Sequence, residues 1–183
     1  MMKKLFILLC FFTVIHYTAE GQDTVEFVLY GNKIGDLTWI GQNIDTATQN
    51  LARFFRVTLE KVPICDGCKE TARKFVIRDK KGILFTLEPG WTDTTYNRIG
   101  EFRTTREEFV SDKGIRVGMT YGDLKKKYRV LNVNYSRGIG VNVIVKGFSG
   151  SFRLQIPEEA LNAEMFYIRN LPDDIPIKEI IMY

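Results

Sequence analysis

Histidine is almost absent from the 183-residue chain, and its single copy, His16, lies close to the N-terminus. Histidine is the side chain that most often serves as a general base or a metal ligand near neutral pH. Serine chemistry also lacks support, because Ser149 does not stand in a nucleophile-elbow pattern and no Ser-x-x-Lys sequence occurs. The sequence therefore predicts no metal site and no cofactor, and an enzyme is the less favoured interpretation.

A large excess of one charge is also missing. The formal net charge is +4, and basic and acidic residues are interspersed along the chain. Nucleic-acid binding needs a concentrated basic surface, so no nucleic-acid partner is predicted. The densest basic run, Lys125–Lys127, is interpreted as the solvated face of a helix.

Residues 1–21 match a signal peptide. Two lysines are followed by the apolar run Leu5–Ile15 and by Ala19–Gly21, which supplies small residues before a cleavage site. The apolar run is shorter than the ~20 residues that span a bilayer. We therefore expect cleavage before Gln22, and we expect residues 22–183 to form one domain without a membrane span. This domain is predicted to be exported to the periplasm or the cell exterior.

Two segments of the chain resemble each other. Gly41–Val57 and Gly118–Val130 each contain a glycine, a helix start, a leucine, an aromatic residue and Arg-Val. The similarity is interpreted either as an internal repeat, covering residues 34–88 and 109–156, or as chance convergence on the same order of strand, glycine, helix and strand. In each segment a helix start is predicted from a capping box, formed by Thr46 with Gln49 and by Thr120 with Asp123.

The rest of the chain is typical of strands joined by short turns. Apolar and polar residues alternate at Val25–Tyr30, and β-rich segments follow the first helix and the second. These segments are Arg56–Lys61, Lys74–Arg78, Ile83–Leu87, Val130–Tyr135, Val141–Val145, Phe152–Ile156, Met165–Ile168 and Ile177–Met182. Successive strands with short turns pair antiparallel. The predicted fold class is α+β, an antiparallel sheet with two short helices packed on one face, arranged as one unit or as two similar strand–helix–meander lobes.

Cys65 and Cys68 form the sharpest local motif, Cys-Asp-Gly-Cys. Exported proteins meet an oxidising compartment, so a structural disulfide is predicted. A thioredoxin-like redox pair is an alternative, but Asp66 beside the thiols disfavours the thiolate and the surrounding pattern is not βαβ. Free or metal-bound thiols are the remaining alternatives.

One loop is a candidate contact surface. Pro89–Asn97 places two large aromatic residues, Trp91 and Tyr96, among small polar residues. Aromatic faces beside hydroxyls and amides suit a glycan or a peptide. The alternative is that Trp91 folds back and covers the sheet edge. Trp39 is predicted to lie in the core.

Adjacent carboxylates occur at Glu107–Glu108, Glu158–Glu159 and Asp173–Asp174. Glycoside hydrolysis needs two carboxylates held apart across a cleft. Neighbours on a strand point to opposite faces, so these pairs are interpreted as solvated surface.

The segment Asp112–Thr120, followed by Asp123-Leu124 and Lys127-Tyr128, resembles a segment of uncharacterised exported bacterial proteins. Its Gly-Met-Thr helix opening is also similar to that of β-lactamase-inhibitor-like domains and of small outer-membrane assembly lipoproteins. The resemblance implies a repeat of two strand–helix units and a non-catalytic binding role. It transfers no functional residue, because the chain lacks a lipid-acceptor cysteine in context and a counterpart to an inhibitor loop.

These observations together predict a non-enzymatic envelope protein that binds a protein, or a small ligand such as a glycan or peptide, through its loops. Trp91 and Tyr96 are the predicted contact residues. Two alternatives remain open, a thiol–disulfide protein that uses Cys65 and Cys68, and a hydrolase that works through carboxylates.

Overall fold

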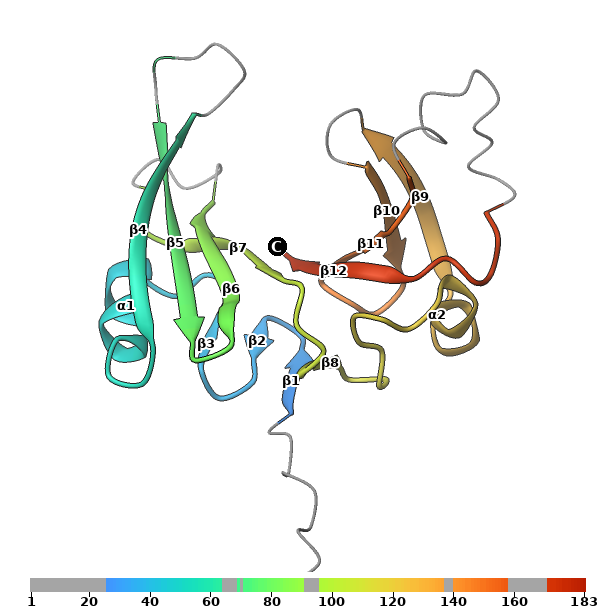
Figure 1. The fold of residues 1–183 in the computed structure, drawn as a ribbon, viewed down its shortest axis with the longest axis horizontal. Coiled ribbons are helices and arrows are strands. Elements are labelled where there is room, and N and C mark those ends of the chain that lie inside the picture. Colours follow the sequence, from blue (N-terminus) through green and yellow to red (C-terminus); the bar gives the residue numbers. More distant parts are fainter. Residues whose placement is uncertain (1–25, 64–68, 70, 91–95, 137–139, 158–170) are drawn as a thin grey trace, which may run out of the picture.

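The computed structural model describes residues 26–63, 69, 71–90, 96–136, 140–157 and 171–183. The predicted signal peptide lies outside these residues. The described part contains two sheets, of four and eight strands, and two short helices (Figure 1). Neither described helix has the length and apolar character needed to cross a bilayer.

The eight-stranded sheet is antiparallel throughout and has the order β4-β5-β6-β7-β12-β11-β10-β9. Its strands, in this order, are Arg56–Pro63, Thr71–Asp79, Gly82–Pro89, Ile99–Thr104, Ile177–Met182, Gly150–Leu154, Gly140–Val145 and Val130–Ser136. The two halves of the sheet meet where β7 pairs with β12, in the register Phe102↔Met182 and Thr104↔Ile180. We call this junction the seam.

The four-stranded sheet is built from very short strands. Its order is β3 (Thr38–Trp39), β2 (Lys33–Ile34), β1 (Phe27–Tyr30) and β8 (Phe109–Ser111). The β1 and β8 strands pair in parallel, and the ring of Phe27 stacks on that of Phe109 with 4.9 Å between centroids. This sheet joins two segments that lie about eighty residues apart in the chain.

One hydrophobic core lies between the eight-stranded sheet and a second layer. In Figure 1, α1 (Ile44–Leu51) lies beside β4, α2 (Tyr121–Lys127) lies toward β9, and the small sheet lies between the helices. The rings of Phe85 and Phe102, from the large sheet, lie 5.6 and 5.3 Å from that of Phe109 in the small sheet. All three side chains are fully buried, so they fasten the layers together.

The predicted α+β fold, with two helices covering one face of an antiparallel sheet, is wrong. The described part of the chain is mostly β, with 54% strand and 12% helix, and its second layer contains a sheet of its own. Strands of two to four residues build this second sheet. One of them, β1, lies within the predicted strand Val25–Tyr30, but β2, β3 and β8 are too short to show a period of two and were not predicted.

Within the described residues, which do not include the predicted strand Met165–Ile168, both halves follow the same order of elements, a helix and then four antiparallel strands. The backbone contacts at each helix start also match. Gly41 donates to the Ile99 carbonyl at 2.7 Å, and Gly118 donates to the Ile177 carbonyl at 2.8 Å; Ile99 and Ile177 begin the fourth strands. A duplication over residues 34–88 and 109–156 stays a prediction, and these ranges leave out the fourth strands.

The helix caps agree with the sequence in one half only. The capping box of Thr120 and Asp123 is confirmed, with the Asp123 amide donating to the Thr120 hydroxyl at 3.1 Å. In the other half the predicted box of Thr46 and Gln49 is wrong. The N-cap is Asn43, whose side chain accepts from the Thr46 amide at 2.9 Å, so α1 begins one turn earlier than expected.

Gly150 marks a close backbone approach on β11, next to the seam strand β12. It faces Met182 across the β11–β12 ladder. A Cβ atom at this position would lie 2.0 Å from the carbonyl oxygen of Ile181, which is far inside van der Waals contact. Only a residue without a side chain fits here.

Candidate functional site

The eight-stranded sheet has a second face, turned away from the core, which we call the outer face. Along β5, β6 and β7 the buried residues Phe75, Leu87 and Phe102 lie in register and belong to the core. Because side chains alternate along a strand, their neighbours Thr86 and Arg103 point to the outer face. The helices and the small sheet pack on the core side.

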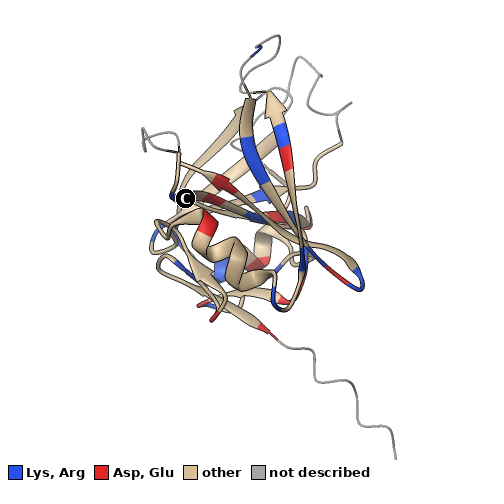
Figure 2. Ribbon diagram, turned by 90° about the vertical axis from the view of Figure 1, so that its left-hand side faces the viewer, with Lys and Arg blue, Asp and Glu red and all other residues tan. Residues whose placement is uncertain are grey.

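Besides the pair Arg78–Glu60 toward the β4 edge, three ion pairs lie nearer the seam on the outer face. Lys74 Nζ lies 3.9 Å from Glu88 Oε1, Arg103 donates to Glu101, and Arg153 Nη1 lies 2.6 Å from Glu179 Oε2. The six residues come from β5, β6, β7, β11 and β12, so the pairs extend across the seam. Figure 2 shows charged positions within strands of the sheet as well as in its loops.

The ion pairs surround a hollow of about 540 Å³. Its walls contain Lys74, Glu88, Arg103, Arg153 and Glu179. The volume suits one or two side chains of a partner or a small ligand. Both signs of charge are therefore presented around one recess.

These charges are partly removed from water. The side chains of Arg153 and Glu179 are 11% and 14% exposed, and those of Lys74, Glu88 and Arg103 are 23–30% exposed. Burial raises the pKa of Glu88, and the neighbouring carboxylate of Glu101 raises it further. Burial likewise lowers the pKa of Arg153. The charges therefore interact more strongly than they would on a flat, fully hydrated surface.

The contact between Arg153 and Glu179 leaves hydrogen-bonding capacity unused. Glu179 Oε2 is buried and lies close to the Arg153 guanidinium, but in a direction that forms no hydrogen bond. The Nε of Arg153 instead donates to Asn142 Oδ1 at 3.2 Å. Because this oxygen is buried, its charge is balanced by the Arg153 guanidinium and not by water.

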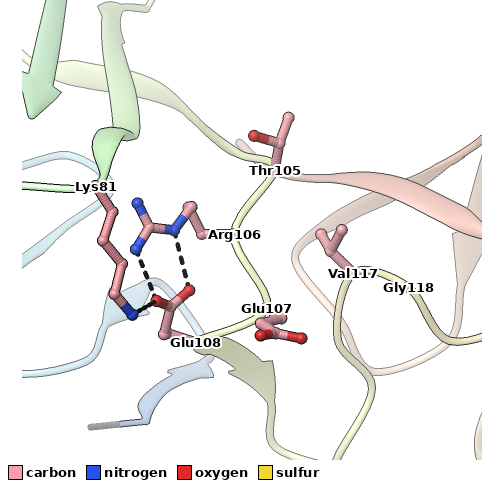
Figure 3. A pocket seen from close by; sticks show the side chains of 7 residues that line it. All are labelled: Lys81, Thr105, Arg106, Glu107, Glu108, Val117 and Gly118. Carbon is pink, nitrogen blue, oxygen red and sulfur yellow. Dashed lines mark hydrogen bonds and ion pairs between the residues drawn. The ribbon is translucent and has the colours of Figure 1, made fainter. Parts of the chain in front are cut away.

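A second hollow, of about 410 Å³, lies where the β5–β6 turn meets the segment before β8 (Figure 3). Arg106 donates through Nε and Nη2 to Glu108 at 3.1 and 2.7 Å, and its guanidinium also bonds both carboxylate oxygens of Asp79. The Lys81 ammonium reaches Glu108 at 3.3 Å. The hydrogen bonds from Arg106 lower the pKa of Glu108 to about 2.

This second cluster is interpreted as a structural link. Its two carboxylates and its guanidinium satisfy one another, and they join the large sheet to the small one. In Figure 3 the carboxylate of Glu107 turns away from that of Glu108. The adjacent pair Glu107–Glu108 therefore does not form a facing pair of carboxylates.

Of the adjacent pair Asp173–Asp174, the first residue lies against α2. Asp173 contacts Lys125 of α2, and Lys126 contacts Asp123 at 3.1 Å. The basic run in the last turn of α2 thus carries local ion pairs. Glu158–Glu159 lies outside the described residues.

Most of the predicted site residues lie outside the described residues, namely Cys65, Cys68 and Trp91. Tyr96 is described, with a half-exposed side chain and a left-handed backbone at φ 49°. Its carbonyl accepts from Arg73 Nη2 at 2.8 Å, and Arg73 also pairs with Asp45 of α1. Tyr96 therefore lies on the helix side of the sheet and not on the outer face.

Sequence reasoning missed the outer face and misplaced one tryptophan. Trp39 was predicted to be core, but 47% of it is exposed. Its neighbour Thr38 is the buried residue of the two-residue strand β3. A signal for the outer face was present as charged residues alternating with apolar ones in Ile99–Thr104, although the charges still had to be brought together by the fold.

Comparison with known proteins shows that the fold of this chain is similar to that of a solved structure. No protein-family model matches the chain, and no curated protein matches it. Among solved structures, the uncharacterised protein YfeY from Escherichia coli is similar, with a TM-score of 0.58 and 13% sequence identity. The match covers 86% of this chain and 98% of YfeY. At this identity it shows a shared fold alone.

Proposed function

We propose that the protein is an exported, non-catalytic binding module, and that the outer face of its large sheet receives a segment of a partner protein that carries charges of both signs. The observation that carries this proposal is the set of three ion pairs around the recess. The export rests on the leader-like sequence of residues 1–21.

The energetics of the ion pairs favour recognition over stability. Partly buried ion pairs contribute little net stability, because the loss of hydration offsets the attraction between the charges. Charges placed in a fixed pattern do give specificity, since a partner with a mismatched pattern leaves them unpaired. The six paired side chains, each 11–30% exposed and five of them lining the recess, fit such a role.

The loop around Trp91 and Tyr96 is a second contact surface within the same proposal. The exposed side chain of Tyr96 supports a role in binding a glycan or peptide. Tyr96 lies on the helix side, so this loop would bind a different part of a partner from the outer face. The resemblance of the Gly118–Thr120 helix opening to inhibitor-like and outer-membrane assembly modules also favours a binding role.

A carboxylate-dependent hydrolase is the second candidate function, and one observation favours it. Glu88 and Glu101 lie directly opposite each other on β6 and β7, and the pKa of Glu88 is raised. A raised pKa is what a general acid requires. Each carboxylate is nevertheless paired with its own cation, Lys74 or Arg103, so binding remains the leading proposal.

The proposal is tested by photo-cross-linking from the recess. The full chain carries a benzophenone amino acid in place of Thr86, which lines the recess, and is incubated with envelope extract of its own organism. The same group in place of Phe54, 80% exposed in the loop after α1, is the matched control. We expect a defined adduct from position 86, lost at high salt, and none from position 54.

A charge exchange tests whether the partner recognises the pattern. The double variant Lys74→Glu, Glu88→Lys keeps the ion pair and the net charge but reverses their positions. We expect the adduct to disappear while the far-UV circular dichroism spectrum is retained. An adduct that forms equally from both positions, or that survives the exchange, contradicts the proposal. Hydrolysis of a glycoside panel that is lost in Glu88→Gln would instead support the second candidate.

A further inference from the structure

The two edge strands of the large sheet, β4 and β9, differ in how they are protected from pairing with a further strand. β4 contains three charged residues and Pro63, which oppose such pairing. β9 is Val130–Ser136 and contains neither a charged residue nor a proline. Leu131 is a bulge, and from Asn132 to Ser136 the register with β10 is regular. Among the described residues β9 pairs with β10 and with no other strand, so its second edge is open to one more.

The hydrophobic core is only partly covered at this edge. Val141 and Val143 of β10 are completely buried. Their partners across the ladder, Tyr135 and Val133 of β9, pack against the core but are only half-buried. A further strand beside β9 would cover the rest of these two side chains with its own side chains of the same face. Because side chains alternate along a strand, the occupant should carry apolar residues at every second position.

Positive charge gathers where β9 begins. Lys127 is the last residue of α2, Arg129 directly precedes β9, and Lys146 directly follows β10. The Lys146 amide donates to the Arg129 carbonyl at 2.9 Å, so these two cations are cross-strand neighbours. All three residues are exposed, and the ion pairs between described residues include none of them. Like charges that face each other across a ladder repel, and a carboxylate placed beside them would remove the repulsion.

We propose that β9 receives an extended segment of a partner protein as an additional strand, with apolar residues at alternate positions and acidic residues at its C-terminal end. The pairings in the large sheet are all antiparallel, so the added strand is assigned the same direction. Its C-terminal end then lies beside Arg129 and Lys146. Main-chain hydrogen bonds hold the segment, and its alternate side chains and acidic end select it.

The charges at the start of β9 favour this occupant over a second copy of the chain. A second copy paired antiparallel would bring the C-terminal end of its own β9 to Arg129 and Lys146, and β9 contains no acidic residue. The open edge is also separate from the recess on the outer face, whose described walls come from β4, β5, β6, β7, β11 and β12. The inference therefore goes beyond the proposed function.

The first test measures binding of a synthetic peptide to the full chain by fluorescence anisotropy. The peptide is Ser-Thr-Val-Thr-Val-Thr-Val-Asp-Asp with a fluorescein at its N-terminus, and the control peptide ends in Asn-Asn and a C-terminal amide. We expect the acidic peptide to bind about tenfold more tightly at low salt, and the difference to vanish at high salt. The double variant Arg129→Gln, Lys146→Gln should remove the difference at low salt as well. Lys33→Gln with Lys80→Gln, which changes the charge equally at exposed positions elsewhere, is the matched control and should retain it.

The second test separates strand addition from attraction between charges. Two forms of the acidic peptide carry N-methyl groups on alternate backbone amides, one form on the odd positions and the other on the even positions. Only one of these sets of N–H groups faces β9, so one form should lose binding and the other should retain it. Amide hydrogen exchange of the full chain, followed by nuclear magnetic resonance, should slow at alternate residues of β9 when the acidic peptide is added, and should not change along β4.

Several results would overturn the inference. They are the absence of peptide binding, equal binding of both methylated forms, equal affinity for the acidic and the amide peptide, and slowed exchange along β4 in place of β9. A dimer that sedimentation detects without peptide, and that slows exchange along β9, would assign the edge to a second copy of the chain. The cross-linking result from Thr86 probes the outer face and is independent of all these outcomes, so failure of this inference and failure of the proposed function are distinguishable.

Discussion

Replacing Arg106 by methionine should loosen the junction between the two sheets. Arg106 is 15% exposed in its side chain, and it donates to Glu108 and Asp79, which are 12% and 25% exposed. Methionine has a similar length and keeps part of the packing, but it leaves two carboxylates facing each other without a cation. The change therefore removes the charge and the hydrogen bonds while leaving most of the volume.

The size of the effect follows from the burial of the cluster. Removing one partner from a fully buried ion pair costs about 3–5 kcal/mol. The Arg106 cluster is partly open, since the side chain of Lys81 at its rim is 68% exposed. Solvent screening reduces the cost, so we expect Arg106→Met to lower the free energy of unfolding by about 2 kcal/mol at pH 7.

The pH dependence gives the prediction a second, independent readout. The pKa of Glu108 is lowered from 4.5 to about 2 in the folded protein. The stabilisation is complete above the unfolded value of 4.5 and is lost as the pH falls from about 4.5 toward 2. The difference between parent and Arg106→Met should therefore shrink at pH 3, because the parent loses the contribution that the variant never had.

Urea unfolding at pH 7 and pH 3, followed by far-UV circular dichroism, measures both quantities. Arg106→Lys keeps the charge but loses the bidentate hydrogen bonds to Glu108, so its free energy of unfolding should lie between those of the parent and Arg106→Met. A loss in Arg106→Met below about 0.5 kcal/mol at pH 7 is the size expected of a surface substitution. That result, or a loss that does not change with pH, would refute the reasoning.

Three further substitutions probe the fold, each measured as the change in the free energy of unfolding in urea. Asn43→Ala should cost about 1 kcal/mol, because it removes the cap of α1, and Thr46→Ala should cost less. Gly150→Ala should cost roughly 1–3 kcal/mol, since its Cβ would strike the Ile181 carbonyl. Phe102→Ala should cost about 3–5 kcal/mol, because a fully buried ring beside the seam is lost.

Each of these has an outcome that contradicts it. A larger loss of unfolding free energy in Thr46→Ala than in Asn43→Ala would show that Thr46 is the cap, as the sequence predicted. A neutral Gly150→Ala would show that the β11–β12 ladder can open by about 1 Å, because the added Cβ would otherwise lie 2.0 Å from the Ile181 oxygen. A cost for Phe102→Ala below about 1 kcal/mol would show that the site collapses around the missing ring.

The sequence predicted the long strands well and the short ones poorly. Runs of β-favouring apolar residues located Lys74–Arg78 and Val141–Val145, which lie within β5 and β10. The pattern did not reveal Ile99–Thr104, where the bulge at Gly100 leaves the buried residues Ile99 and Phe102 three positions apart. That strand is β7, half of the seam, so the union of the two meanders into one sheet could not be deduced.

The candidate site could not be predicted from the sequence, for a related reason. Arg153 and Glu179 are neighbours only because β11 pairs with β12, and Arg103 joins them only because β7 pairs with β12. Sequence spacing gives no register between strands so far apart in the chain. Trp39 shows the same limit at short range, because a strand of two residues does not indicate which side chain points inward.

The seam has a consequence for how the molecule assembles. Each helix-and-meander half is closed by local pairings, whereas β7 and β12 are separated by more than seventy residues and share the short register Phe102↔Met182 to Thr104↔Ile180. Closing so long a loop is entropically costly and slows the step that requires it. The two halves should therefore fold early and separately. Pairing of β7 with β12 at the seam should come last and should limit the rate of folding.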